Sequence, residues 1–342
     1  MKITLLGTLS RRSGGASLGT LAAAGVFAFA AGCTLTVTPL GDDAGATPDG
    51  SVVTVTSDGG SDAAVDAADA SVARCDLATP FATVSDVGSV VASATLRSDE
   101  LEMFSVDAAG ALLRSTRATV GAAFGAPEVV EMPVPAKKMA VHLAPDGLRL
   151  YLTAFVRTGN EPGDGHPELF TTTRASLAGA FAAPTALSLK APVFNLLNTP
   201  HIAPDGASLF FTAAGGGSTG VFKIALPAGT MEDARALGNE VFVDPRPVFT
   251  RGNVLTRDGL HMYTSVVEVN GGGGGPLDGT GTLALSTRAS ASDKFGTPVL
   301  LGSPAHVVGT NDLPQWLSPD QCRLYYVAGD GAAPLKVASR AP

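Results

Sequence analysis

The feature that most constrains this chain is a short motif that occurs five times between residues 96 and 321. The motif begins with Leu or Ile and has Asp at its fourth position, followed by Gly in three of the copies. Asp can bond the backbone two residues further on, and Gly relieves the strained corner of a tight turn. Each copy therefore predicts a strand, a tight turn and a second, apolar strand. The copies are Leu96–Glu100, Leu143–Gly147, Ile202–Gly206, Leu255–Gly259 and Leu317–Gln321.

A second motif follows the first in three of the copies. A Thr-Arg-Ala sequence leads to a Phe and then a Pro, and the Arg-to-Phe and Phe-to-Pro intervals are the same each time. The third copy has Val221–Ile224 at this place, without Thr-Arg, and the fifth ends near Arg340. Two motifs that alternate in fixed order indicate structural repeats. The three complete instances start at Ser115, Thr172 and Ser286.

The spacing of the repeats predicts the architecture. Successive motif Asp residues lie 47, 59, 53 and 62 positions apart, which leaves room for four short antiparallel strands in each repeat. The chain has 41 Gly and 23 Pro and only 16% charged residues, a composition that favours strands joined by many turns. We expect an all-β fold, a β-propeller of four-stranded antiparallel blades, with five blades, or six if a degenerate repeat lies in a long interval.

With both motifs in place, the chain resembles the Pro-Asp type of WD40-like repeats found in TolB-like propellers, in particular exported bacterial lipoproteins that carry them. The resemblance runs from about Pro80 to Arg340. It implies a propeller but no particular activity, because such folds host binding platforms and enzymes alike.

The N-terminus has the features of an export signal. Basic residues precede an apolar run at 18–31 that is too short to span a bilayer, and small residues lead to Cys33. The sequence at 30–33, Ala-Ala-Gly-Cys, resembles a lipobox, although Ala30 stands where Leu is usual. We expect residues 1–32 to be a lipoprotein signal peptide and Cys33 to be lipidated, which would make the mature protein an exported one.

Two alternatives stay open at this end of the chain. A plain signal peptide cut near Ala31 would leave Cys33 incidental, and Ser10–Arg12 hints at twin-Arg rather than Sec export. Residues 33–74 are rich in Ala, Asp, Gly, Ser and Thr, which predicts a disordered tether. We expect the propeller domain to span 75–342.

The last repeat stops where an outer strand should follow, and Pro80–Val84 precedes the first repeat. We therefore expect the N-terminal segment to supply the missing strand and close the ring. With Cys33 set aside for lipid, Cys75 and Cys322 remain, and in an exported protein they are best interpreted as one disulfide. Two unrelated buried thiols are the alternative.

Candidate ligand-binding residues come from the differences between repeats. His142 and His201 each stand four residues before the motif Asp, and Trp316 has the same place in the fifth copy. Neutral imidazoles there could ligate a metal or contact a ligand near the central channel, or they could be structural. We find no nucleophile elbow, phosphate loop or zinc motif, so we expect no catalytic residues, no metal and no cofactor.

The formal net charge of −8 disfavours nucleic acid and anionic lipid headgroups as partners. Membrane contact is therefore expected only through the lipid anchor, at a periplasmic or outer-membrane surface. The sequence favours a monomeric, non-catalytic cell-envelope scaffold that binds a protein or a glycan. The alternative is a glycan-active hydrolase or lyase with its site at the channel mouth.

Overall fold

Each of the five turn motifs joins the first two strands of an antiparallel sheet. The computed structural model describes residues 74–133, 136–157, 165–187, 196–215, 218–226, 248–268, 281–302, 311–329 and 331–341. The predicted signal peptide, Cys33 and nearly all of the tether lie outside these residues. The described residues all belong to one unit, Ser61–Pro342.

Four sheets follow the chain order, and we number them accordingly. Sheet 1 contains β2 (Ser93–Leu96), β3 (Glu102–Val106), β4 (Leu112–Thr116) and β5 (Glu128–Val129). Sheet 2 contains β6 (Ala136–Leu143), β7 (Arg149–Arg157), β8 (Gly165–Thr173) and β9 (Thr185–Ala186). In sheet 3 the described strands are β10 (Leu196–Ile202), β11 (Ser208–Gly215) and β12 (Ser218–Ala225). Sheet 4 contains β13 (Val248–Leu255), β14 (His261–Glu268), β15 (Gly281–Thr287) and β16 (Val299–Leu300).

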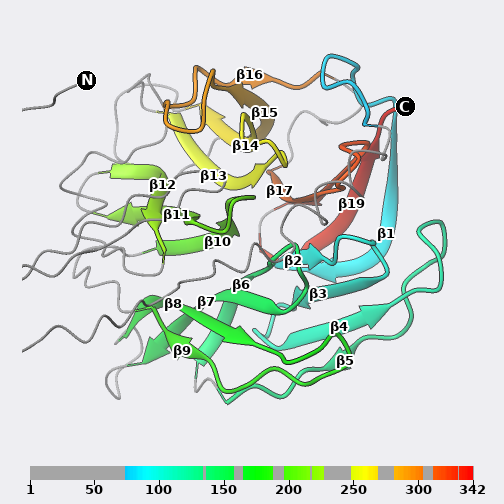
Figure 1. The fold of residues 1–342 in the computed structure, drawn as a ribbon, viewed down its shortest axis with the longest axis vertical. Helices are drawn as coiled ribbons and strands as arrows, with labels where there is room; N and C mark the ends of the chain where they lie inside the picture. Colours follow the sequence, from blue (N-terminus) through cyan, green and yellow to red (C-terminus); the bar gives the residue numbers. More distant parts are fainter. Residues whose placement is uncertain are drawn as a thin grey trace, which may run out of the picture. The chain divides into compact units, whose positions relative to one another are not determined.

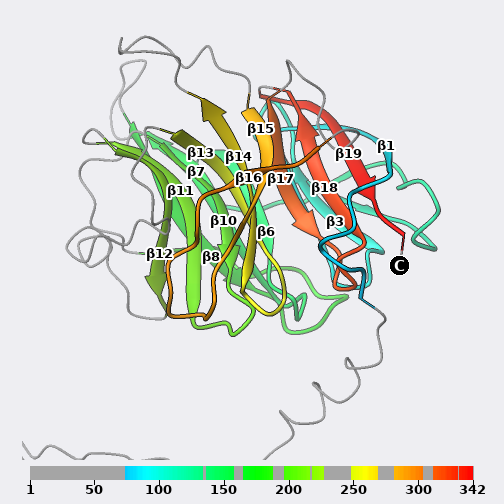
Figure 2. The ribbon, with the colours of Figure 1, turned by 90° about the horizontal axis from the view of Figure 1, so that it is seen from above.

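The fifth sheet, which we call the closing sheet, combines both ends of the described chain. Its order is β1-β19-β18-β17, so β1 (Thr83–Val91) lies outside β19 (Ala333–Ser339), β18 (Arg323–Ala328) and β17 (Asp312–Leu317). Thr83 is paired with Ser339 and Val91 with Ala333. Figure 1 and Figure 2 show β1 beside β19. The predicted completion of the last blade by the N-terminal segment is confirmed.

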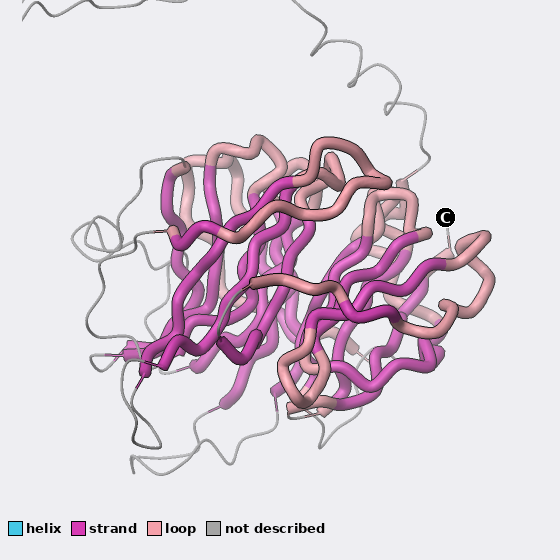
Figure 3. Tube along the Cα trace, turned by 90° about the horizontal axis from the view of Figure 1, so that it is seen from below, coloured by secondary structure: helices cyan, strands magenta, loops and turns pink. Residues whose placement is uncertain are grey.

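The five sheets follow one another around a ring (Figure 1). The innermost strand of the closing sheet, β17, contacts β13 of sheet 4 and β2 of sheet 1, which leaves no place for a sixth sheet. Strands and loops account for all of the described residues (Figure 3). The predicted all-β propeller is confirmed with five blades. No helix in the described part of the chain is long and apolar enough to cross a membrane.

The turn motifs have the predicted geometry. In every copy the Asp Oδ1 accepts a hydrogen bond from the backbone N–H two residues on, at 2.8 to 3.0 Å. The residue after Asp has φ between 61° and 70°, a left-handed conformation that favours Gly. Glu100 and Gln321 adopt it without being Gly, and Glu100 also contacts Arg323 of the closing sheet.

The motif arginines tie these turns to the outer edge of each sheet. Nε of Arg117, Arg174 and Arg288 donates to the carbonyl of the left-handed residue at 2.7 Å in all three cases. Each guanidinium also lies over the motif Phe seven residues later, with its carbon 4.4 to 4.9 Å from the ring centroid. Arg340 lies over Phe81 at 3.9 Å, so the N-terminal segment supplies the Phe that the last repeat lacks.

A separate apolar cluster fills each contact between neighbouring sheets, which we call a seam. The cluster between sheets 1 and 2, for example, joins Phe104 and Leu112 to Val141 and Leu150. Similar clusters join sheet 2 to sheet 3, sheet 3 to sheet 4, sheet 4 to the closing sheet, and the closing sheet to sheet 1. Burial of this surface, at about 25 cal/mol per Å², stabilises the ring seam by seam.

A disulfide fastens the N-terminal segment to the closing sheet. Cys75 and Cys322 are bonded, with their Cα atoms 5.1 Å apart, which is the pairing expected from the sequence. Cys322 follows the turn of the last repeat, and the Cys75 N–H donates to the Asp320 carbonyl at 2.8 Å. The bond spans 247 residues, so it closes nearly the whole ring.

Replacing both Cys75 and Cys322 by Ser should lower the free energy of unfolding by about 2 to 5 kcal/mol, because the unfolded chain regains the entropy of an open loop. Urea denaturation of the double variant and the parent measures the difference. Non-reducing peptide mapping of the parent should yield the linked Cys75–Cys322 peptide. Two free, alkylated thiols would contradict the assignment.

Candidate functional site

The structure brings His142 and His201 into contact. His142 lies on β6 and His201 on β10, and their ring centroids are 4.1 Å apart with the ring planes inclined at 45°. Both residues are buried, at 4% and 7% exposure. Burial lowers the pKa of His201 to about 3 and, together with the nearby His201 ring, lowers the pKa of His142 well below its usual value. The pair is therefore neutral at physiological pH.

The hydrogen bond to His201 fixes its tautomer. The Leu255 N–H on β13 donates to His201 Nε2 at 3.3 Å, so the neutral ring carries its proton on Nδ1. Within the described structure, His201 Nδ1 and His142 Nε2 have no hydrogen-bond partner. These two nitrogen atoms are therefore buried without a polar contact that would stabilise a charge on either ring.

The pair is a packed contact rather than a metal chelate. Two imidazoles that share a tetrahedral metal at about 2.0 Å from each nitrogen place their centroids roughly 5 Å apart. The observed 4.1 Å is shorter, and the Nε2 lone pair of His201 is already engaged. Among the described residues, no group of three or more His, Cys, Asp and Glu side chains is placed to hold a metal ion.

Trp316 does not join the histidines. It packs edge-on against Tyr325, with ring centroids 5.6 Å apart. It belongs to the apolar cluster between the closing sheet and sheet 1, together with Ala94 and Leu96. The three residues proposed from the sequence thus occupy two different seams.

In two copies the matched inner-strand position has a role that the sequence did not reveal. Its side chain accepts a backbone hydrogen bond from the next sheet around the ring: Thr95 accepts from the Leu143 N–H at 3.0 Å, and His201 accepts from the Leu255 N–H at 3.3 Å. Further along the inner strands, Gln315 Oε1 accepts from the Ala94 N–H at 2.9 Å. These side chains connect the inner strands directly to one another.

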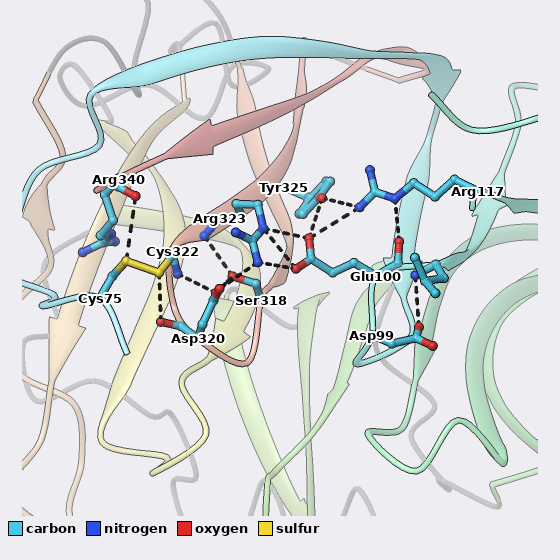
Figure 4. Close-up of polar contacts among 11 residues, drawn as sticks. Cys75, Asp99, Glu100, Arg117, Ser318, Asp320, Cys322, Arg323, Tyr325 and Arg340 are labelled. Atoms are coloured by element: carbon cyan, nitrogen blue, oxygen red, sulfur yellow. Dashed lines mark hydrogen bonds and ion pairs between the residues drawn. A yellow bond between two sulfur atoms is a disulfide. The ribbon is translucent and has the colours of Figure 1, made fainter. Parts of the chain in front are cut away.

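A polar cluster that the sequence did not predict surrounds Glu100 (Figure 4). Its side chain is 3% exposed and lies in the seam between sheet 1 and the closing sheet. Arg323 donates to the carboxylate with Nη2 at 2.6 Å and Nε at 2.9 Å, and the Tyr325 hydroxyl donates at 2.7 Å. The Arg117 Nη2 lies 3.5 Å from the same carboxylate and 3.1 Å from the Tyr325 hydroxyl.

This cluster explains why Glu stands at position 100, where three of the other four turns have Gly. The left-handed backbone at Glu100 costs free energy, and the carboxylate offsets that cost by binding one arginine of its own sheet and one of the closing sheet. Hydrogen bonding to Glu100 raises the pKa of Arg323, while burial and the negative charge of Glu100 raise the pKa of Tyr325. Both donors therefore stay protonated across the physiological range.

A second buried carboxylate, Glu102, occupies the neighbouring seam. It is 1% exposed and binds Arg174 of sheet 2 through two hydrogen bonds, at 2.8 and 3.2 Å. Arg114 Nε and Arg97 Nη1 also contact it, at 2.6 and 3.3 Å. Hydrogen bonds and charges from Arg174 and Arg114 outweigh burial and lower the pKa of Glu102. Both glutamates thus bind blades together.

The chain was compared with known proteins. No protein-family model and no curated protein matches it. Among solved structures, TolB from Acinetobacter baumannii is 14% identical with a TM-score of 0.42, over 74% of this chain and 55% of TolB, about half of that protein's length.

Two further solved structures are similar at the same level. The PQQ-bound aldose sugar dehydrogenase from Streptomyces coelicolor is 12% identical with a TM-score of 0.44, over 77% of this chain and 100% of that one. A gluconolactonase from Xanthomonas campestris is 13% identical with a TM-score of 0.39, over 71% and 70%. These values are too low to carry the dehydrogenase or the gluconolactonase activity over to this chain.

Replacing Glu100 by Gln should lower the free energy of unfolding by about 3 kcal/mol, because Arg323 and Arg117 would lose their buried counter-charge. Urea denaturation at pH 7 measures the loss. Glu128→Gln, at an exposed position on β5, is the matched control and should change stability by less than about 0.5 kcal/mol. Equal stability of both variants would show that the Glu100 cluster does not hold the seam.

Proposed function

We propose that this protein is a non-catalytic, exported lipoprotein, anchored to the cell envelope through Cys33, whose five-bladed propeller binds an envelope protein or glycan. The proposal has three parts, which are the anchor, the absence of catalysis and the binding role. Each part rests on separate support and has its own test.

The proposed absence of catalysis rests on the contacts that the buried carboxylates make. Glycan hydrolysis needs two carboxyl groups that face a substrate, one of them free to give or take a proton. Glu100 and Glu102 are the deeply buried glutamates of the described residues, and both are enclosed by arginines at 2.6 to 3.3 Å. The motif Asp side chains are engaged by backbone N–H groups in their turns. These acids serve the architecture, which favours binding over acid-base chemistry.

Two observations support export. The Ala-Ala-Gly-Cys sequence at 30–33 follows an apolar run, and the Cys75–Cys322 disulfide is of a kind that persists in oxidising compartments. A tether of about forty residues between Cys33 and Cys75 would let the propeller search for a partner near the surface.

Lipidation is tested by metabolic labelling with a radioactive fatty acid in a bacterial host. The parent should incorporate label and sediment with membranes, whereas Cys33→Ser should do neither, because the thiol that receives the lipid is gone. Cys75→Ser is the control for the loss of a cysteine elsewhere and should keep the label. Labelling of Cys33→Ser would exclude Cys33 as the attachment point.

The binding role is tested by cross-linking and affinity capture of the tagged mature protein from its own envelope. We expect a partner recovered in near-stoichiometric amount that a tagged tether, residues 33–74, does not recover. Incubation with an array of envelope glycans tests the enzymatic alternative. Turnover of any glycan by the purified protein would overturn the non-catalytic proposal and favour the hydrolase or lyase alternative.

A further inference from the structure

The inner strands are joined across the seams by side chains that accept backbone N–H groups, but these acceptors differ chemically around the ring. Thr95 and Gln315 are acceptors that do not titrate, and they serve the seams on either side of sheet 1. At the seam between sheets 3 and 4 the acceptor is the imidazole of His201. Next to it, His142 on β6 contacts the His201 ring across the seam between sheets 2 and 3, with the ring planes inclined at 45°.

An imidazole accepts a hydrogen bond only while it is neutral. Protonation of His201 would place a proton on Nε2, directly opposite the Leu255 N–H, so two donors would face each other and the bond would be lost. A charged His201 would also lie 4.1 Å from the His142 ring, and charging both rings would set two cations in contact. A single proton therefore disturbs two adjacent seams.

The surroundings offer no compensation for such a charge. No carboxylate of the described residues contributes to the pKa of either histidine, which burial lowers in both. Asn253 on β13 is a buried polar residue of the same seam, but it is uncharged and its amide donates to the Thr199 carbonyl on β10 at 2.9 Å. The remaining groups across the strand pairings are Tyr151 on β7, with Arg149 bonded to it, Phe210 on β11, and Lys223 on β12 over the Phe210 ring at 5.7 Å.

We propose that His142 and His201 make the contacts among sheets 2, 3 and 4 sensitive to acid, while the seam between the closing sheet and sheet 1 stays closed. The inference does not depend on the binding role proposed above. For both histidines the pKa in the folded protein lies below the unfolded value of about 6.5. Their contribution to stability is therefore complete above pH 6.5 and is lost as the pH falls towards the folded values.

Hydrogen exchange at single residues tests the proposal. Protection of the Leu255 amide, corrected for the intrinsic exchange rate, should fall on the order of thirtyfold between pH 7.5 and pH 5.0, if opening exposes one such histidine. The Ala94 amide, which donates to Gln315 Oε1 in the seam between the closing sheet and sheet 1, is an internal control and should change much less. An equal response of the two amides would overturn the proposal.

Two variants test whether the pH response of the Leu255 amide comes from His201. His201→Gln keeps an acceptor for Leu255 but does not titrate, so the pH response of the Leu255 amide should disappear. His166→Gln removes an exposed histidine on β8 and should leave that response unchanged. A full response in His201→Gln, or its loss in His166→Gln, would contradict the assignment.

A measurement on the parent protein covers the case in which His201→Gln does not fold. In an NMR titration of the histidine rings, the signals of His142 and His201 should stay at their neutral positions from pH 7.5 to pH 5.0. A midpoint near 6.5 for either ring would overturn the proposal.

Discussion

The pairing of β1 with β19 is the interaction on which the rest of the structure depends, because it joins the two ends of the described part of the chain within one sheet. Everything else at the closing sheet reinforces that pairing. Arg340 lies over Phe81 and donates to the carbonyls of Asp76, Leu77 and Thr79 at 3.0 to 3.1 Å. In each complete repeat, the motif Arg and the Phe that it covers come from one continuous segment. In the closing sheet they come from segments about 260 residues apart.

The seams of the ring are not equivalent, although the strands that form them are. On either side of sheet 1, buried glutamates bind arginines that cannot lose their charge at physiological pH. Between sheets 2, 3 and 4 the polar contacts include neutral imidazoles and the uncharged amide of Asn253. The repeats thus share a backbone plan but use different chemistry to hold neighbouring blades. Selection for function, as distinct from selection for folding, can act on these differences between the seams.

The sequence predicts the features that local chemistry determines. The turn geometry at Asp146 follows from the motif. The completion of the last blade by the segment around Phe81 follows from the order of the repeats, and the pairing of Cys75 with Cys322 follows from the number of cysteines. What it could not predict depends on which way a matched side chain points. His142 and Trp316 occupy the same repeat position, yet that position faces along the ring into a seam, so they never meet. The one local signal for the Glu100 cluster was the missing Gly, which marks an unusual turn but does not name Arg323 as its partner.

The place of the disulfide has a mechanical consequence. Cys75 is the second described residue, so any pull on the chain before it reaches the ring at Cys322, through a covalent bond, in the turn between β17 and β18. Strand β1 begins after Cys75, so the disulfide is a covalent path for that force in parallel with the β1–β19 ladder. Because a covalent bond is much stiffer than a row of hydrogen bonds, a propeller pulled by the segment before Cys75 would keep its closing ladder until the sulfur–sulfur bond gave way.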